Sequence, residues 1–126
     1  MKAHFILYVS DQKRSAGFYE AVLDQKPRLD VPGMTEFELS GSGVLGLMPE
    51  AGIKRLLGDL LPDPAAANGA PRAELYLIVD DPGASHRRAL DNGARELSPL
   101  ALRDWGHEAA YCLDLDGHVL AFAREK

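Results

Sequence analysis

Hydrophobic and polar positions follow two different periods along the chain, and the order of those periods occurs twice. A dense apolar run at residues 4–9 precedes helical spacing at residues 11–24, and strand-like runs follow at residues 35–39 and 44–48. In the second half a strand is expected at residues 74–79, a helix at 82–94, and further strands at 95–97, 107–115 and 118–123. The pattern predicts strand, helix and two or three strands, followed by strand, helix and three strands.

Residues at the ends of these elements support the assignment. Ser10 or Asp11 can cap the first helix, and Pro82 suits the first position of the second. Asp114 and Asp116 are expected to shape the turn between the last two strands.

The two halves match position by position at a shift of seventy residues. Four residues recur at that shift, namely Leu7, Val9, Asp11 and Ser15, which match Leu77, Val79, Asp81 and Ser85. The run VLGL at residues 44–47 also resembles VLAF at residues 119–122. We therefore expect an α+β fold of two tandem βαβββ modules in a single domain of residues 1–126. Module one spans residues 1–48, a linker 49–72 and module two 73–126; the alternative is an α+β sandwich with coincidental similarity.

The linker is too long to be a plain turn. Residues 53–57 could form one or two helical turns, and residues 62–71 have the composition of a connector. Two interpretations remain open: a connector packed on the surface, or a flap that covers a cavity with its paired leucines.

Composition narrows the possible partners. The 126 residues are 46% hydrophobic and 26% charged, with a formal net charge of −5. The acidic balance argues against nucleic acid and an anionic membrane as partners. The single cysteine, Cys112, excludes an internal disulfide and is expected to be a small core residue. No signal peptide or membrane-spanning run is evident, so a cytoplasmic protein is expected.

Three stretches together resemble one known family. They are the strand ending in Val-Ser-Asp at residues 9–11, the helix pattern R-S-x-x-F-Y-x-x-V-L at 14–23, and the terminal D-x-D-G-H-x-L-x-F at 114–122. The pattern resembles the vicinal oxygen chelate superfamily, which includes glyoxalase I, bleomycin-resistance proteins and extradiol dioxygenases. The resemblance implies paired modules whose curved sheets enclose a cavity for a small-molecule ligand, commonly across a homodimer.

Metal-dependent members of that superfamily draw ligands from the first and last strand of each module. The matching positions in this chain are His4, Gly46, Glu74 and Ala121. Glycine and alanine carry no donor atom, whereas a transition-metal site generally needs three or more protein ligands. The resemblance therefore implies no cofactor, although a weak divalent metal site on His4 and Glu74 is possible. Glu50 or His118 could supply a further donor, and without metal the simplest partner for Glu74 is His4.

Strand alternation gives the expected cavity wall without reference to the family. The residues that share faces with the four positions above are Ile6, Tyr8, Val44, Met48, Tyr76, Ile78, Val119 and Ala123. Trp105 is expected at the mouth, where it could stack on a flat ligand. Phe37 and Tyr111 are predicted to occupy equivalent places in the two modules, either in the wall or in the core.

Three functions fit these expectations. The first is a protein that binds a small, partly aromatic or apolar molecule without a tightly bound metal, based on Gly46, Ala121 and the apolar wall. The second is a metal-dependent lyase, isomerase or dioxygenase that uses His4 and Glu74. The third is a regulatory module whose cavity is vestigial.

Overall fold

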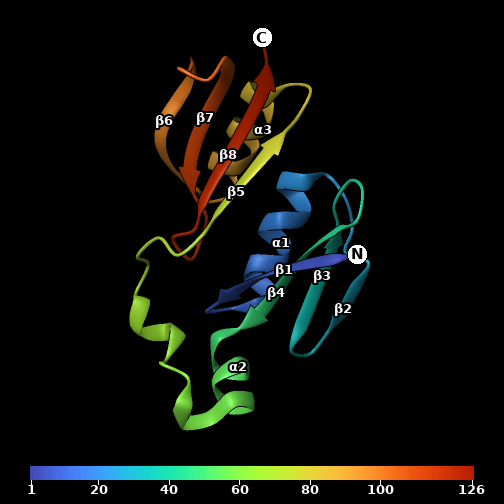
Figure 1. Ribbon diagram of the computed structural model, residues 1–126, viewed down its shortest axis with the longest axis vertical. Coiled ribbons are helices and arrows are strands. Elements are labelled where there is room, and N and C mark those ends of the chain that lie inside the picture. The colour runs from blue at the N-terminus through green and yellow to red at the C-terminus, as the bar shows by residue number, and fades with distance from the viewer. The chain divides into compact units, whose positions relative to one another are not determined.

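The computed structural model of the protein describes residues 1–126 and contains two four-stranded sheets with three α-helices (Figure 1). In chain order the elements are β1 (Ala3–Val9), α1 (Gln12–Leu23), β2 (Leu29–Val31), β3 (Met34–Glu38), β4 (Gly43–Pro49), α2 (Glu50–Leu57), the 3-10 helices η1 (Gly58–Leu60) and η2 (Pro64–Ala67), β5 (Glu74–Ile78), α3 (Pro82–Asp91), β6 (Arg95–Leu102), β7 (His107–Leu113) and β8 (Val119–Glu125). Strand, helix and three strands occur twice, which confirms the predicted α+β fold of tandem βαβββ modules.

The two sheets have the same strand order. In the first the order is β1-β4-β3-β2, and in the second it is β5-β8-β7-β6. The first and last strand of each module pair in parallel, and the remaining neighbours pair antiparallel. The chain divides into two compact units, which we describe separately. Unit 1 comprises Met1–Glu20 and Asp24–Asn68, and unit 2 comprises Ala21–Leu23 and Gly69–Lys126.

In unit 1, one face of the sheet is apolar and lies on the same side as α1. Asp11 caps the helix by accepting a hydrogen bond from Arg14 N, as the sequence predicts. Gln12 donates to Thr35 Oγ1 at 2.9 Å, which places the start of α1 on the Thr35 side of β3. By strand alternation the same side carries a buried set, namely Leu7, Val9, Phe37, Leu45 and Leu47.

In unit 2, α3 covers the corresponding face. Asp81 caps α3 by accepting from Ala84 N, and Pro82 occupies the first turn. His86 on α3 lies 2.9 Å from the Glu96 carboxylate on β6, which fixes the side of the sheet that α3 covers. The buried side chains on that side are Ala110, Cys112, Leu120 and Phe122.

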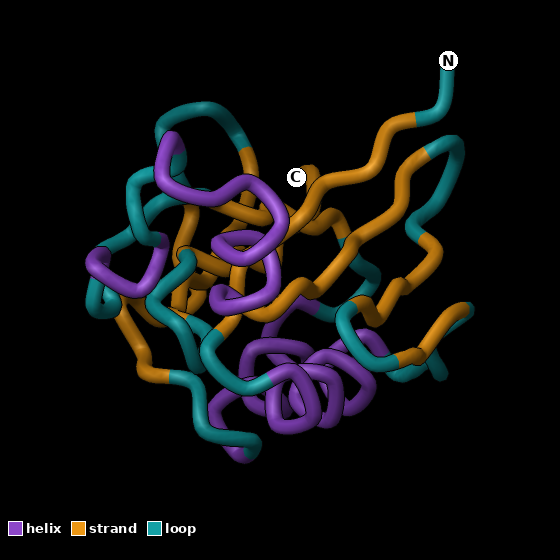
Figure 2. Tube along the Cα trace, turned by 90° about the horizontal axis from the view of Figure 1, so that it is seen from below, coloured by secondary structure: helices purple, strands orange, loops and turns teal.

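Two elements are longer than the sequence pattern predicts. β6 extends to Leu102 rather than ending at Leu97, with register shifts between Glu96 and Ala101 that accommodate Pro99. The segment expected to form one or two helical turns is the eight-residue α2, followed by η1 and η2 (Figure 1). Figure 2 distinguishes the helices, strands and loops of the chain by colour. None of the helices is long and apolar enough to cross a membrane.

The end of the connecting segment is attached to the β7–β8 turn. Arg72 donates to Asp116 O at 2.9 Å and lies 3.0 Å from His118 Nε2. Asp114 holds the turn from inside, because its carboxylate accepts from the backbone N–H groups of Asp116 and His118, as predicted for a turn residue.

Two glycines, one in the turn before β7 and one in the turn before β8, test how closely the connecting segment packs against the β7–β8 turn. Gly106 and Gly117 both have φ of 88°. A side chain at Gly106 would meet open space, whereas one at Gly117 would overlap the backbone of Gly69. We expect Gly117→Ala to lower the free energy of unfolding by roughly 2–5 kcal/mol, and Gly106→Ala by only about 1–2 kcal/mol. Urea unfolding of both variants measures the difference, and equal losses would contradict the packing of the connector on the turn.

Candidate functional site

The residues predicted from module one share one face of the unit 1 sheet, which we call the His4 face. His4, Ile6 and Tyr8 on β1 pair in register with the β4 residues that were predicted beside them, namely Val44, Gly46 and Met48. Glu36 on β3 pairs with Gly46 and adds a carboxylate to this face. The His4 face is therefore the side of the sheet opposite Phe37 and α1.

Gly46 leaves space that its neighbour on β1 fills. A Cβ atom at this position would lie 2.5 Å from Ile6 Cδ1 and 3.3 Å from Met34 Sδ. The position that carries a metal donor in metal-dependent members is thus occupied by the end of the Ile6 side chain. A larger residue at Gly46 would require Ile6 to move.

Glu36 is the carboxylate that contacts His4. Its side chain is 11% exposed, with Oε2 3.5 Å from His4 Nδ1 and Oε1 2.9 Å from Arg28 Nε. Glu36 is the main cause that raises the pKa of Arg28 above its ordinary value, with a further contribution from Glu38. The sequence predicts Glu74 as the partner of His4; within unit 1 the carboxylate that contacts His4 is Glu36.

In unit 2 the corresponding face, which we call the Tyr76 face, is the side of the sheet opposite α3. Glu74, Tyr76 and Ile78 on β5 pair with the β8 residues Val119, Ala121 and Ala123. Tyr111 on β7 pairs with Ala121, and His107 begins the same strand on the same side. Glu74 is exposed, and Ala121 is fully buried.

The Tyr76 hydroxyl joins two other rings. Trp105 Nε1 donates to the Tyr76 hydroxyl oxygen at 2.9 Å, and His107 Nδ1 lies 2.8 Å from the same oxygen. The Tyr76 and His107 rings are 5.9 Å apart and tilted by 32°. The Trp105 ring is held at one edge while the residue stays 56% exposed. This arrangement leaves an indole face fixed in direction and accessible to a flat molecule.

A cation lies beside these rings. The Arg103 guanidinium is 5.2 Å from the centre of the Tyr111 ring and donates to Ser98 Oγ and Ala109 O. Burial raises the pKa of Tyr111, the charges of Glu74 and Tyr76 raise it further, and Arg103 acts in the opposite direction. Tyr111 is therefore a neutral hydrogen-bonding group at physiological pH.

The predicted equivalence of Phe37 and Tyr111 is wrong. Phe37 pairs with Leu45 and is fully buried on the α1 side, whereas Tyr111 pairs with Ala121 on the Tyr76 face. The residue that occupies the place of Tyr111 in unit 1 is Glu36, which pairs with Gly46. A shift of one residue moves a strand side chain to the other face, and the comparison of the modules was displaced by one.

His118 is not free to supply a further donor at these faces. Its Nδ1 lies 2.9 Å from Asp114 Oδ2, its Nε2 faces Arg72, and its side chain is 3% exposed. Glu50, the other such candidate, is the first residue of α2.

Four polar residues of these faces were missed by the sequence analysis: Arg28, Glu36, Arg103 and His107. Alternation along β3 and β7 could have placed Glu36 and His107 on the correct faces. Arg28 precedes β2, and Arg103 follows β6, so no strand period could position their side chains.

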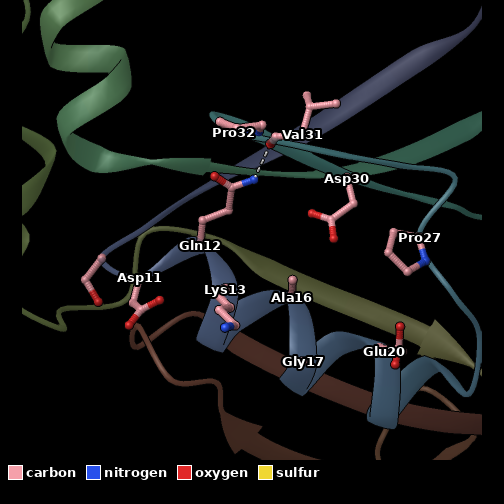
Figure 3. Close-up of a pocket in the computed structure, with 11 residues that line it drawn as sticks. Asp11, Gln12, Lys13, Ala16, Gly17, Glu20, Pro27, Asp30, Val31 and Pro32 are labelled. Atoms are coloured by element: carbon pink, nitrogen blue, oxygen red, sulfur yellow. Dashed lines mark hydrogen bonds between the residues drawn. The ribbon is translucent and has the colours of Figure 1, made fainter.

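Unit 1 has a groove of about 750 Å³ on the α1 side, away from the His4 face. It lies between α1 and the segment that leads through β2 (Figure 3). Gln12 spans one end by donating to Val31 O at 2.8 Å and accepting from Gly33 N. Its lining comes from the start and exposed side of α1 and from the segment around β2, and it includes none of the predicted site residues.

Neither unit by itself supplies the three donors that a transition-metal centre generally needs. Neither unit brings three or more His, Cys, Asp or Glu side chains together in a geometry that could hold a metal ion. The last-strand positions, Gly46 and Ala121, offer no donor atom, and the His4 imidazole faces a carboxylate that also binds Arg28.

Comparison with known proteins agrees with the fold. The family model described as the Glyoxalase/Bleomycin resistance protein/Dioxygenase superfamily matches residues 3–122. A glyoxalase-related enzyme from Fulvimarina pelagi is similar in structure, with a TM-score of 0.83 and 20% identity over 99% of this chain and 88% of that one. A glyoxalase/bleomycin resistance protein/dioxygenase family enzyme from Burkholderia phytofirmans has a TM-score of 0.79 and 14% identity, over 98% of this chain and 97% of that one. No curated protein matches the chain.

Cys112 gives a direct test of the packing between the unit 2 sheet and α3. Burial raises the pKa of its thiol to about 12, with smaller contributions from Asp114 and Glu96. The reactive thiolate is therefore scarce at neutral pH, and the thiol is fully buried. We expect an aromatic disulfide reagent to label Cys112 only after unfolding in guanidinium. Rapid labelling of the native protein would show that the sheet does not close over this residue.

Proposed function

The chain belongs to the Glyoxalase/Bleomycin resistance protein/Dioxygenase superfamily, and on this premise we propose that it binds a small, partly aromatic molecule without a tightly bound metal ion. The observation that carries the proposal is the Tyr76 face, where an exposed indole is fixed by a hydrogen bond to a tyrosine. A ring held in advance loses little conformational freedom when a ligand stacks on it, so more of the stacking energy appears as affinity.

The small residues of the last strands support the non-metal part of the proposal. At Gly46 the neighbouring Ile6 methyl group takes the space, and at Ala121 the side chain is a single methyl group. The side chains named in the sequence analysis as ligand contacts remain part of the proposal. They are His4, Ile6, Tyr8, Val44, Gly46, Met48, Glu74, Tyr76, Trp105, Tyr111 and Ala121. His107 and Arg103 join them on the Tyr76 face.

We extend the proposal to assembly and location. Because members of this superfamily commonly work as dimers, we propose that the chain forms a homodimer. We also propose that it is cytoplasmic. Sedimentation velocity at micromolar concentration tests the dimer, and a single monomeric species would contradict it.

Binding is measured by thermal shift across a library of aromatic compounds, followed by calorimetric titration of those that stabilise the protein. A ligand at one hundred times its Kd raises the free energy of unfolding by about 2.7 kcal/mol, which is a readily measured shift. We expect Trp105→Ala to weaken binding about fivefold to tenfold, because one stacked ring is removed. Leu60→Ala is the control, since Leu60 is 97% exposed on η1. A library without a single stabilising compound would contradict the proposal and favour the vestigial module.

The second candidate is a metal-dependent lyase, isomerase or dioxygenase that uses His4 and Glu74. The observation in its favour is that both donors are accessible: the His4 side chain is 38% exposed and Glu74 is exposed. We expect calorimetric titration with Zn²⁺, Ni²⁺ and Mn²⁺ to give only weak binding, since few donors remain. Micromolar binding that is lost in both His4→Ala and Glu74→Ala, and kept in the surface control Asp59→Asn, would overturn the non-metal proposal.

A further inference from the structure

The Tyr76 hydroxyl has one hydrogen-bonding position that its two neighbours do not use. A phenolic oxygen has one donor and two acceptor positions. Trp105 Nε1 only donates, so it takes one acceptor position of the Tyr76 oxygen at 2.9 Å. His107 Nδ1 lies 2.8 Å from the Tyr76 oxygen and takes a second position. The protonation state of His107 decides whether that second position is the donor or an acceptor.

A neutral His107 leaves the Tyr76 oxygen able to accept. A phenol is the stronger donor and an imidazole nitrogen the stronger acceptor, so the favoured arrangement has the Tyr76 hydroxyl donating to His107 Nδ1. The hydroxyl proton is then in use, together with the acceptor position filled by Trp105. The remaining position can only accept a hydrogen bond from a ligand.

When His107 is protonated, the direction of its hydrogen bond to Tyr76 is reversed. Both imidazolium nitrogens are donors, so Nδ1–H must donate to the Tyr76 oxygen. With Trp105 and His107 both donating, the two acceptor positions of the oxygen are filled. The Tyr76 hydroxyl proton is then released, and the remaining position can only donate.

We propose that Tyr76 and His107 form a protonation-dependent hydrogen-bond switch, and that the Tyr76 face selects a hydroxy-aromatic molecule of the phenol type when His107 is neutral. The ring of the ligand stacks on the Trp105 indole, and its hydroxyl donates to the Tyr76 oxygen. The inference rests on the proposed function and names the ligand class of the same site. Tyr76 contacts the ligand, and His107 is a positioning residue that acts through Tyr76.

The charged and titratable groups near His107 are Arg103, Glu125 and Tyr111. Arg103, whose backbone N–H donates to His107 O, directs its guanidinium to Ser98 Oγ and Ala109 O. On β8 the register partner of His107 is Glu125, which is exposed. Tyr111, on the same face of β7, stays neutral because burial raises its pKa. The test compares about pH 8 with about pH 5, because histidine side chains in general change charge between these values.

Trp105 is the only tryptophan of the chain, and its fluorescence reports on the site directly. The probes are para-cresol and its methyl ether, which have the same ring and differ in the hydroxyl proton. At about pH 8 we expect para-cresol to bind about threefold to tenfold more tightly than the ether, the value of one hydrogen bond. At about pH 5 we expect the preference to disappear, because Tyr76 then has no acceptor position left.

Two variants test whether Tyr76 and His107 cause the preference for para-cresol and its dependence on pH. Tyr76→Phe should bind both probes equally at either pH. His107→Asn keeps a side-chain oxygen that accepts from Tyr76 and does not titrate, so its preference for para-cresol should persist at low pH. The pH dependence of the Trp105 emission without ligand should also disappear in His107→Asn, and this readout does not depend on binding.

The outcomes separate this inference from the proposed function. Equal binding of the two probes at about pH 8, or a preference that survives in Tyr76→Phe, overturns the switch while leaving aromatic binding intact. The absence of binding by either probe, with other aromatic compounds bound, overturns the phenol assignment alone. A Trp105 emission that titrates identically in wild type and His107→Asn overturns the coupling between His107 and Tyr76.

Discussion

The strict alternation of side chains along a β-strand is the constraint on which the rest of this structure depends. In each unit it sends one set of apolar residues towards a helix and the other set to the opposite face. Phe37 and Leu45 are buried on the α1 side of unit 1, while Glu36 and Gly46 face the other way. Polar side chains can lie on one face of a sheet without disturbing the core on the other face, because residues adjacent in the sequence point to opposite faces.

The His4 face and the Tyr76 face have the same strand arrangement but carry different polar groups. On the His4 face the central carboxylate is occupied by an arginine, so its charge is largely balanced within the unit. On the Tyr76 face the equivalent position carries Tyr111, and the neighbouring side chains of Tyr76, Trp105 and His107 are joined by hydrogen bonds. Neutral hydroxyls retain unused donor or acceptor capacity after such bonds form, whereas a charge that is paired and partly buried resists a new partner. For this reason the proposed selection of a hydroxy-aromatic ligand involves the Tyr76 face.

The order of the elements, the cap of α1, the first position of α3 and the turn at Asp114 could be predicted from sequence, because each depends on residues close together in the chain. The contacts of the candidate site could not. Arg28 reaches Glu36 from outside β2, and Trp105 reaches Tyr76 from the turn before β7, so their positions depend on loop geometry. The error over Phe37 and Tyr111 has a different origin. The two modules were aligned with a displacement of one residue, and such a displacement exchanges the two faces of a strand.

The last-strand positions Gly46 and Ala121 carry no donor atom, and the packing around each limits the size of any residue that could replace it. At Gly46 a new side chain would meet Ile6 Cδ1 at 2.5 Å, so a donor introduced there must displace a packed methyl group. In unit 2, Ala121 is fully buried and pairs in register with Tyr76 and Tyr111, so a longer side chain there would have to be accommodated beside these two residues. Overpacking in a close-packed region costs about 1–3 kcal/mol per site. A donor side chain introduced at either position would therefore require compensating changes on the neighbouring strands.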